Sequence, residues 1–244
     1  MAAPTRKESI EKMQRAMESF GIVLEDTMLK QFMQYYEVLV QTNKVMNLTA
    51  ITEFDEVLMK HFVDSVSLAK VVSCKGQSIL DIGTGAGFPG VPLKIVFPSA
   101  RVTLLDALQK RVSFLQTLTG DLQLEDIRAV HGRAEEFAAV PGERESYDLV
   151  VSRAVSGLPV LAELMLPFVA VGGKMIAYKS AEVLEELESA QRAIELLGGK
   201  VENVESFSLP ESDIRRVLVV ISKVKNTPGK YPRRPGIPEK KPIL

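Results

Sequence analysis

Residues 80–90 read LDIGTGAGFPG and continue a short apolar run that begins at Ser78. The stretch contains four glycines and one proline in eleven residues. Glycine loses more conformational entropy on folding than any other residue, so this density indicates a loop whose backbone takes special angles or approaches another group closely. A strand that leads into such a loop and then into a helix is typical of a nucleotide-binding site.

The alternation of strand and helix continues from this stretch to about residue 197. Strands are expected at 78–82, 101–105, 127–130, 147–152 and 174–178, and helices at 89–97, 108–120, 158–169 and 181–197. Parallel strands joined by crossover helices explain this order. Two further strand-like runs, 201–209 and 214–224, are only four residues apart, which predicts an antiparallel hairpin. The sequence therefore predicts an α/β fold with a mostly parallel, seven-stranded sheet that ends in an antiparallel hairpin.

The first 74 residues carry helical periodicity instead, in three amphipathic segments that follow a capping box at Thr5 and Glu8. The third segment contains His61 and Asp64, one turn apart. We interpret these two as a surface or interfacial pair, because nothing nearby in the sequence completes a catalytic set. The regions expected from these patterns are a small helical part at 1–74, a ligand-binding domain at 75–225 and a basic, Pro-rich, extended tail at 226–244.

The composition is ordinary for a globular protein, with 46% hydrophobic and 25% charged residues in a chain of 244. The apolar runs are shorter than the roughly 18 residues that a membrane span needs, and the first residues lack the apolar core of a secretory signal. The only cysteine, Cys74, cannot form an internal disulfide. We therefore expect a cytoplasmic protein without a membrane partner. With two histidines and this one cysteine, no metal site is expected.

The net charge of −1 conceals an uneven distribution. Residues 223–244 contain seven Lys or Arg and a single acidic residue, Glu239, so the rest of the chain is acidic. A basic tail on an acidic body indicates either a polyanionic partner such as RNA or simply a solvated chain end.

The glycine loop spells GxGxxG at 85–90, so a dinucleotide-dependent dehydrogenase has to be considered. Asp81 ends the first strand just before the loop, where a carboxylate would repel a diphosphate but suit an ammonium group. Asp106 ends the second strand and is placed to accept hydrogen bonds from ribose hydroxyls. A ligand with an ammonium group, a ribose and an adenine but no phosphate is S-adenosylmethionine. The contacts expected for this cofactor are Asp81, Gly85, Gly87 and Asp106.

Four separated stretches and the tail resemble one family. LDIGTGAGFPG at 80–90, LLDALQKRVSFL at 104–115, VVSRAV at 150–155 and NLTAI at 47–51 are similar to the RsmG (GidB) family of bacterial ribosomal RNA methyltransferases, as is the tail KYPRRPGIPEKKPIL. The similarity covers nearly the whole chain. It implies a Rossmann-like class I methyltransferase that uses S-adenosylmethionine to methylate N7 of one guanine in 16S ribosomal RNA of the small ribosomal subunit.

The resemblance also implies roles for single residues. The cofactor contacts that it implies are Gly83 and Phe88 in the loop and Ala134 and Glu135 beside the adenine, with Arg153 at the mouth of the site. The chain departs from the family pattern at Lys179-Ser180, where many members have Lys-Gly. This difference lies at the expected entrance for the substrate.

Methylation at guanine N7 makes few chemical demands. N7 carries an unshared electron pair at neutral pH and can attack a sulfonium methyl group in line, so positioning and electrostatics suffice. Accordingly, the sequence lacks a His-centred triad, and Cys74 precedes the first strand, away from the strand ends where such sheets bind ligands. It also lacks the Asp/Asn-Pro-Pro-aromatic run of amine methyltransferases and a complete Lys-Asp-Lys-Glu set of ribose methyltransferases.

Arg153 and Lys179 are the residues expected at the reaction site. A guanidinium after the fourth strand can bind guanine O6 or a phosphate, or stack on a base. Lys179 ends the fifth strand and would hold RNA phosphate, or lie on the surface. The expected RNA contacts in the tail are Lys230, Tyr231, Arg233 and Arg234, with the tyrosine as a stacking platform. Deletion of residues 226–244 is then expected to weaken RNA binding and to spare cofactor binding.

Four alternatives remain at this point. The chain could methylate another RNA position, or methylate a small molecule or protein on the same fold. It could also be a non-catalytic RNA-binding or ribosome assembly factor that keeps a cofactor pocket, and then replacing Arg153 by alanine would leave function intact. A dehydrogenase would bind NAD in place of S-adenosylmethionine.

Overall fold

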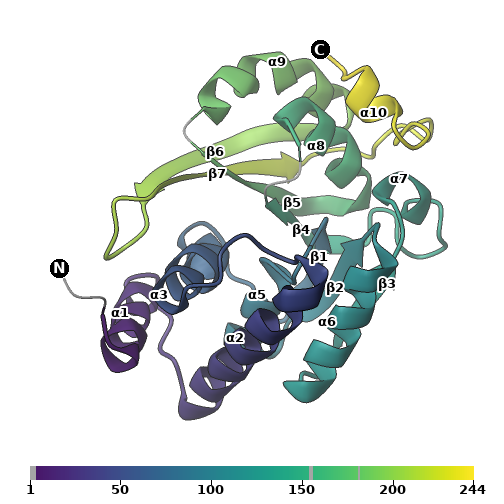
Figure 1. Cartoon of the computed structure of the whole chain (residues 1–244). Coiled ribbons are helices and arrows are strands. Elements are labelled where there is room, and N and C mark those ends of the chain that lie inside the picture. Colours follow the sequence, from purple (N-terminus) through teal and green to yellow (C-terminus); the bar gives the residue numbers. More distant parts are fainter. Residues whose placement is uncertain (1–3, 154–155, 181) are drawn as a thin grey trace.

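A computed structural model of the chain describes residues 4–153, 156–180 and 182–244. Ala154 and Val155, which end the VVSRAV stretch, and Ala181, the expected first residue of a helix, lie outside the described residues. One seven-stranded sheet with the order β3-β2-β1-β4-β5-β7-β6 runs through the centre of the molecule (Figure 1). Its strands are β1 (Ser78–Ile82), β2 (Arg101–Asp106), β3 (Ile127–His131), β4 (Tyr147–Arg153), β5 (Val169–Lys179), β6 (Gly199–Ser208) and β7 (Arg215–Lys223).

The pairing of the strands confirms the predicted topology. Strands β1 to β5 are parallel, whereas β7 pairs antiparallel with both β5 and β6. Strand β7 runs antiparallel to β6 because the four residues 210–213 are too few to form a crossover connection. The order also brings the carboxyl ends of β1, β2 and β4 together at one edge, which is where sheets of this type bind ligands.

Helices cover both faces of the sheet (Figure 1). On one face lie α1 (Arg6–Glu18), α2 (Asp26–Met46), α5 (Gly90–Val96) and α6 (Gln109–Asp121), and on the other α7 (Ala134–Phe137), α8 (Leu158–Met165), α9 (Val183–Leu196) and α10 (Ile237–Lys240). The helical segment expected from residue 52 is continuous but changes type, through α3 (Phe54–Val57), the π-helical η1 (Leu58–Val63), α4 (Asp64–Val66) and the 3₁₀-helical η2 (Ser67–Lys70). Such π-helical turns are frequent at functional sites, and this one carries His61.

The N-terminal helices share a hydrophobic core with the sheet. Met13 of α1, Phe32 of α2 and Phe62 of η1 are fully buried in the same cluster as Leu104 of β2 and Leu115 of α6. Helix α1 begins with the predicted capping box, in which the Glu8 amide donates to Thr5 Oγ1 and the Thr5 amide donates to Glu8 Oε2. Burial of an apolar stripe from each helix therefore fixes residues 6–70 against the sheet face that holds the glycine loop.

The expectation of a helix over 158–169 is wrong at its end. Helix α8 stops at Met165, the short 3₁₀ helix η3 (Leu166–Phe168) follows, and Val169 already pairs with Tyr147 as the first residue of β5. Pro167 cannot donate the backbone hydrogen bond that a longer helix would require. Strand β5 consequently begins five residues before the predicted start, with a register shift between Tyr147 and Leu149.

The expectation of an extended tail is also wrong. Tyr231 is only 9% exposed and belongs to the core of the α8–α9 face, and the residues Ile237–Lys240 form α10 against α8. In Figure 1 the yellow C-terminal segment folds back beside α8 and α7. Tertiary contacts with buried partners, which proline content alone does not reveal, decide this conformation.

Candidate functional site

Three cavities follow one another along the carboxyl ends of the central strands. The first, of about 120 Å³, is lined by Gly83, Leu105, Ala134, Glu135 and Glu239 among others. The second, of about 230 Å³, lies at the glycine loop, and the third, of about 420 Å³, contains Lys60, Lys179 and Arg216. Gly83 borders the first two cavities, and His61 and Arg153 border the last two. An elongated ligand can therefore occupy the first two, with a second substrate at the third.

A larger cavity of about 510 Å³ lies elsewhere. It is lined by the first residues of the same strands, among them Ser78, Arg101, Ile127 and Tyr147. These residues are at the amino ends of the strands, opposite the glycine loop. We therefore place the candidate site at the three smaller cavities, where the loop and the strand ends meet.

Asp81 holds the glycine loop from beneath. Its Oδ2 accepts hydrogen bonds from Thr84 Oγ1 at 2.6 Å and from the Gly90 amide at 2.8 Å, and the side chain has no exposed surface. Burial raises the pKa of this carboxyl to about 6, against the lowering effect of the two hydrogen bonds. The carboxylate does not line any of the three cavities, but its Oδ1 is buried and meets no hydrogen-bond donor among the described residues, so contact with the ammonium group of the cofactor stays a prediction.

Gly90 leaves no room for a side chain. A Cβ atom there would lie 2.3 Å from Leu104 Cδ2 and 2.9 Å from Asp81 Oδ2. We expect Gly90→Ala to lower the free energy of unfolding by about 1–3 kcal/mol, since overpacking shifts buried neighbours. Urea unfolding measures this loss. Gly120→Ala is the matched control, because a Cβ in that helical position meets no atom within 4 Å; an equal loss in both variants would contradict the packing argument.

Gly87 serves packing more than ligand access. A Cβ atom at Gly87 would lie 2.7 Å from Tyr35 Oη and 2.8 Å from Val91 Cγ2, and the backbone there has a φ of +104°. Tyr35 of α2 reaches the loop and donates a hydrogen bond to the Ala86 carbonyl at 2.6 Å. The N-terminal region therefore fixes the loop directly. Gly85 lines the second cavity, whereas Gly87 does not. The absence of a side chain at Gly87 is explained by its packing against Tyr35 and Val91, and its contact with the cofactor stays a prediction.

Asp106 also binds the loop. Its Oδ2 accepts from the Gly85 amide at 2.9 Å and lies 3.4 Å from Arg111 Nη1, and its Oδ1 accepts from the Leu108 amide at 2.9 Å. The carboxylate is almost completely buried. Ribose binding by Asp106 stays a prediction, and it would require hydroxyl groups to share or replace the hydrogen bond from Gly85.

Arg153 lies where the second and third cavities meet. Its Nη1 donates to Asp64 Oδ2 at 2.9 Å and to the Lys60 carbonyl at 3.0 Å, and its guanidinium lies 5.1 Å from the centre of the Phe88 ring. Within residues 4–153, 156–180 and 182–244, no acceptor meets its Nε–H. The guanidinium is therefore held in place and keeps a donor for a ligand.

His61 completes this cluster. Its ring stacks on Phe88 with 4.4 Å between ring centres, its Nε2 lies 2.8 Å from Thr49 Oγ1, and its Nδ1 lies 3.2 Å from Arg153 Nη2. Because a guanidinium can only donate, Nδ1 accepts and we assign the ring proton to Nε2. Burial, together with the nearby Arg153 charge, lowers the pKa of His61 to about 3. The imidazole is thus neutral near pH 7.

The lowered pKa of His61 makes stability depend on pH. Between about pH 6.5 and 3 the unfolded chain binds a proton at this residue and the folded chain does not, so stability falls as pH falls from 6.5. We expect the unfolding free energy of the native protein, relative to His61→Gln, to drop by about 2 kcal/mol from pH 7.5 to pH 5. The comparison cancels the opposite contribution of Asp81, whose raised pKa disfavours folding as pH rises from 3.8 to about 6. Parallel pH curves for both proteins would refute this.

Lys179 is less free than predicted. Its Nζ donates to the Ser156 carbonyl at 2.7 Å and to Glu186 Oε2 at 2.9 Å, and the same carboxylate accepts from the Leu158 amide. The side chain lines the third cavity but is 14% exposed. Its ammonium group therefore positions the segment that follows β4, and contact with RNA phosphate stays a prediction.

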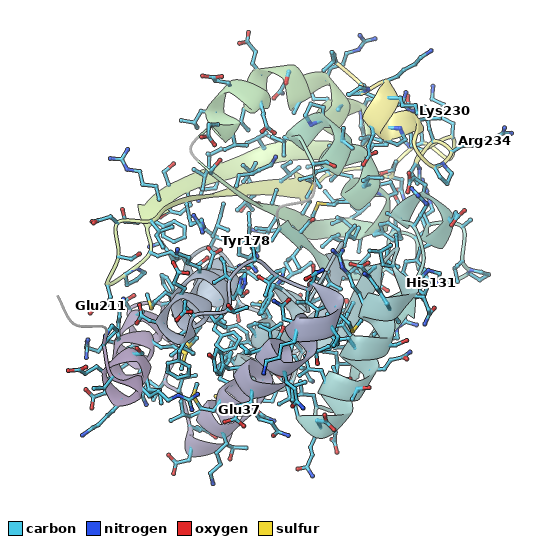
Figure 2. All side chains as sticks on the ribbon, viewed as in Figure 1. Glu37, His131, Tyr178, Glu211, Lys230 and Arg234 are labelled. Carbon is cyan, nitrogen blue, oxygen red and sulfur yellow. The ribbon has the colours of Figure 1, made fainter. Side chains whose placement is uncertain are left out.

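The four predicted RNA contacts of the tail divide into two groups. Tyr231 is buried, and Arg233 forms an ion pair with the buried Glu163. Lys230 and Arg234 lie on the outer side of the segment (Figure 2). The proposed stacking platform at Tyr231 and phosphate clamp at Arg233 are corrected, because both side chains are committed to contacts within the chain.

Sequence reasoning missed several residues of the site. Asp64, interpreted as part of a surface or interfacial pair, is 2% exposed and binds both Arg153 and Arg216, whose Nε lies 2.8 Å from Asp64 Oδ1. Thr49 lies within the NLTAI stretch, and His61 bridges it to Arg153. A signal was present in the spacing of His61 and Asp64 by one helical turn, but their arginine partners lie more than 85 residues away.

The described residues fit S-adenosylmethionine. Ile82, Leu105 and Leu164 give the first cavity an apolar lining suited to a purine. A Cβ at Gly85 would meet only the Gly83 carbonyl, at 4.0 Å, so the loop surface there is open. Aromatic and cationic groups from Phe88 and Arg153 then bound the second cavity, where the methionine part would lie. Within the described part of the chain, no helix is long and apolar enough to cross a membrane, and no cluster of three potential metal ligands occurs.

Comparisons with known proteins identify the family. The family model GidB, described as rRNA small subunit methyltransferase G, matches residues 28–216. A curated relative from Lachnoclostridium phytofermentans, named ribosomal RNA small subunit methyltransferase G, is 52% identical over 94% of this chain and 96% of its own. A relative of the same name from Bacillus cereus is 49% identical over 96% and 99% of the two chains. The chain belongs to this family.

Solved structures show the same fold at low sequence identity. A SAM-dependent methyltransferase from Aquifex aeolicus superposes with a TM-score of 0.51 and 17% identity, covering 69% of this chain and 93% of that one. TrmN from Thermus thermophilus gives a TM-score of 0.52 and 17% identity, covering 68% and 53%. The fold is that of class I S-adenosylmethionine-dependent methyltransferases, as predicted, and the cofactor expected from the sequence agrees with both family and fold.

Proposed function

We propose that this member of the family transfers a methyl group from S-adenosylmethionine to N7 of a guanine in 16S ribosomal RNA. Bound S-adenosylmethionine supplies a methyl group on a positively charged sulfur. The first cavity would hold its adenine between Ala134 and Leu105, and the loop residues Gly83 and Gly85 would hold the rest. An enzyme that acts on ribosomal RNA would work in the cytoplasm.

The observation that carries this proposal is that neither His61 nor Cys74 is available to accept a proton in the part of the chain that the structure describes. His61 is neutral, its Nδ1 electron pair accepts from Arg153, and its Nε2 carries the proton. Cys74 is buried, and burial raises its thiol pKa to about 12. A nucleophile that must first lose a proton, such as a ribose hydroxyl, would find no acceptor in these groups, whereas guanine N7 needs none. Direct in-line transfer without a covalent intermediate fits this arrangement.

The third cavity supports an RNA substrate. Lys60, Arg153, Lys179 and Arg216 line it, and Asp64 is the acidic residue among the described lining residues. A cationic concave surface of this kind suits a polyanion. Arg153, whose Nε–H meets no acceptor among the described residues, would bind guanine O6 and orient the base toward the methyl group. In-line transfer then depends on how well these residues align the two reactants.

Mapping of modified nucleotides by mass spectrometry tests the proposal. Ribosomal RNA from cells with and without the gene, and small subunits incubated with purified protein and S-adenosylmethionine, are digested and compared. One guanine in 16S ribosomal RNA should gain a methyl group only when the protein is present, and the RNA should then be cleaved at that 7-methylguanosine after borohydride reduction and aniline treatment. Unchanged maps, or a methyl group at another atom, would refute it.

A further inference from the structure

The C-terminal segment, residues 227–244, is anchored at several points. Glu163 of α8, with no exposed surface, accepts from the Arg233 amide at 2.8 Å, from Arg233 Nε at 2.9 Å and from Arg233 Nη2 at 2.6 Å. Arg144 donates to the backbone carbonyls of Thr227 and Tyr231, each at 2.8 Å. Because the buried carboxylate is fully compensated by Arg233, undocking the segment would leave a charge without a partner.

The same segment borders the first cavity. The Gly236 amide donates to Glu135 Oε1 at 3.0 Å, and Glu239 of α10 lines the cavity together with Ala134 and Leu105. Glu135 lies just after β3, and Glu239 lies more than 100 residues later in the sequence. The two side chains therefore meet at one pocket only when the C-terminal segment is docked. The wall of the pocket is therefore incomplete without residues 236–239.

The chemistry of this wall points to an amino group on the ligand. The cavity joins an apolar lining to two carboxylates, those of Glu135 and Glu239, and to one guanidinium, that of Arg133. Carboxylates are acceptors only, so they favour an aminopurine, which donates from its exocyclic nitrogen, over an oxopurine, which presents an acceptor at that position. A carbonyl oxygen placed there would face like partial charge.

We propose that the C-terminal segment is part of the methyl-donor site: Glu239 helps to select adenine, and docking of the segment and binding of the donor stabilise each other. The proposal rests on the proposed use of S-adenosylmethionine. It reverses the expectation that the tail binds RNA and leaves the donor site untouched. In this proposal the Arg233–Glu163 ion pair supports donor binding indirectly, because it holds the C-terminal segment against α8.

Calorimetric titration of S-adenosylhomocysteine into the full-length protein tests the docking part. Arg233→Ala should weaken binding at least about tenfold, because part of the binding free energy must then redock the segment. Arg234→Ala removes the same charge from the adjacent, exposed position and should bind within about twofold of the native protein. Equal affinity of Arg233→Ala and native protein would overturn the proposal.

The role of Glu239 has its own test, which does not depend on the folding of Arg233→Ala. Binding of S-adenosylhomocysteine is compared with that of S-inosylhomocysteine, whose purine has a carbonyl in place of the amino group. The native protein should prefer the adenosyl compound, and Glu239→Gln should reduce this preference about tenfold, since an amide can donate or accept. An unchanged preference would refute the selection of adenine by Glu239.

Hydrogen exchange of the native protein supplies a reciprocal measurement. Coupling between two binding events is mutual, so saturating S-adenosylhomocysteine should slow amide exchange at residues 236–241. Unchanged exchange there would contradict the coupling. If the native protein bound no S-adenosylhomocysteine at all, the proposed function itself would fail. Normal binding that is insensitive to these variants would instead refute only the role of the C-terminal segment.

Discussion

Arg153→Ala is expected to lower the turnover of methyl transfer by about 100- to 1,000-fold, the usual effect of removing one preorganised donor from a reaction site. Arg153 lies between the second cavity, proposed for the methyl donor, and the third, proposed for RNA, and its guanidinium is fixed by Asp64, Lys60 and His61. Without it, the base loses the donor that would orient it. Transfer of a radiolabelled methyl group to small subunits measures the effect.

The structure supplies controls for this experiment. Arg153→Lys should recover little activity, because an ammonium cannot keep the contacts to Asp64 and His61 while stacking on Phe88. Arg101→Ala removes an exposed arginine at the amino end of β2, away from the candidate site, and should leave turnover unchanged. Calorimetry with S-adenosylhomocysteine checks that the variants still bind the donor. Full methyl transfer by Arg153→Ala would refute the proposed role of Arg153, whereas no methyl transfer by the native protein would favour a non-catalytic assembly factor.

Arg233→Ala is expected to lower the free energy of unfolding by about 3–5 kcal/mol, whereas Glu163→Gln should cost clearly less. Removing Arg233 leaves the buried carboxylate of Glu163 without its partner. Removing the carboxylate leaves Arg233, whose side chain is 29% exposed and can turn toward water. The expected asymmetry follows from burial, since a surface ion pair would show small and similar losses on either side.

Urea unfolding, followed by the same spectroscopic signal for every variant, measures the loss of unfolding free energy in Arg233→Ala and in Glu163→Gln. A double variant, Glu163→Met with Arg233→Met, should recover most of the stability that Arg233→Ala loses, because an apolar pair needs no compensation in the interior. Equal effects of the two single variants would show that Glu163 reaches water when its partner is removed.

Much of the donor side of the site could be predicted from local sequence. The glycine loop, the acidic residues that end β1 and β2, and Arg153 at the end of β4 all lie in short motifs next to strands. Their positions follow from the rule that parallel strands gather their carboxyl ends at one edge. The hydrogen bonds that Asp81 Oδ2 accepts from Thr84 and Gly90 could not be predicted, because they depend on how the loop folds back over the end of β1.

The cluster around Asp64 lay beyond sequence reasoning for a different reason. Asp64, Arg153 and Arg216 come from α4, β4 and β7, and each charge taken alone looks like an ordinary solvated group. Their pairing depends on how the N-terminal helices pack across the sheet edge. Glu163 is the one acidic residue in the otherwise apolar helix LPVLAELM, which indicates a buried carboxylate that needs a partner. That partner, Arg233, lies 70 residues later and could not be identified from the sequence.

The sequence by itself determined the fold and the family, because strand and helix periods, turn lengths and the glycine loop act over a few neighbouring residues. Only the tertiary structure decided which charges are buried together and where the C-terminal segment lies. The reason is physical: a buried carboxylate such as Glu163 must find a donor wherever the chain can bring one, and that choice outweighs the tendency of a basic, Pro-rich segment to stay extended in water.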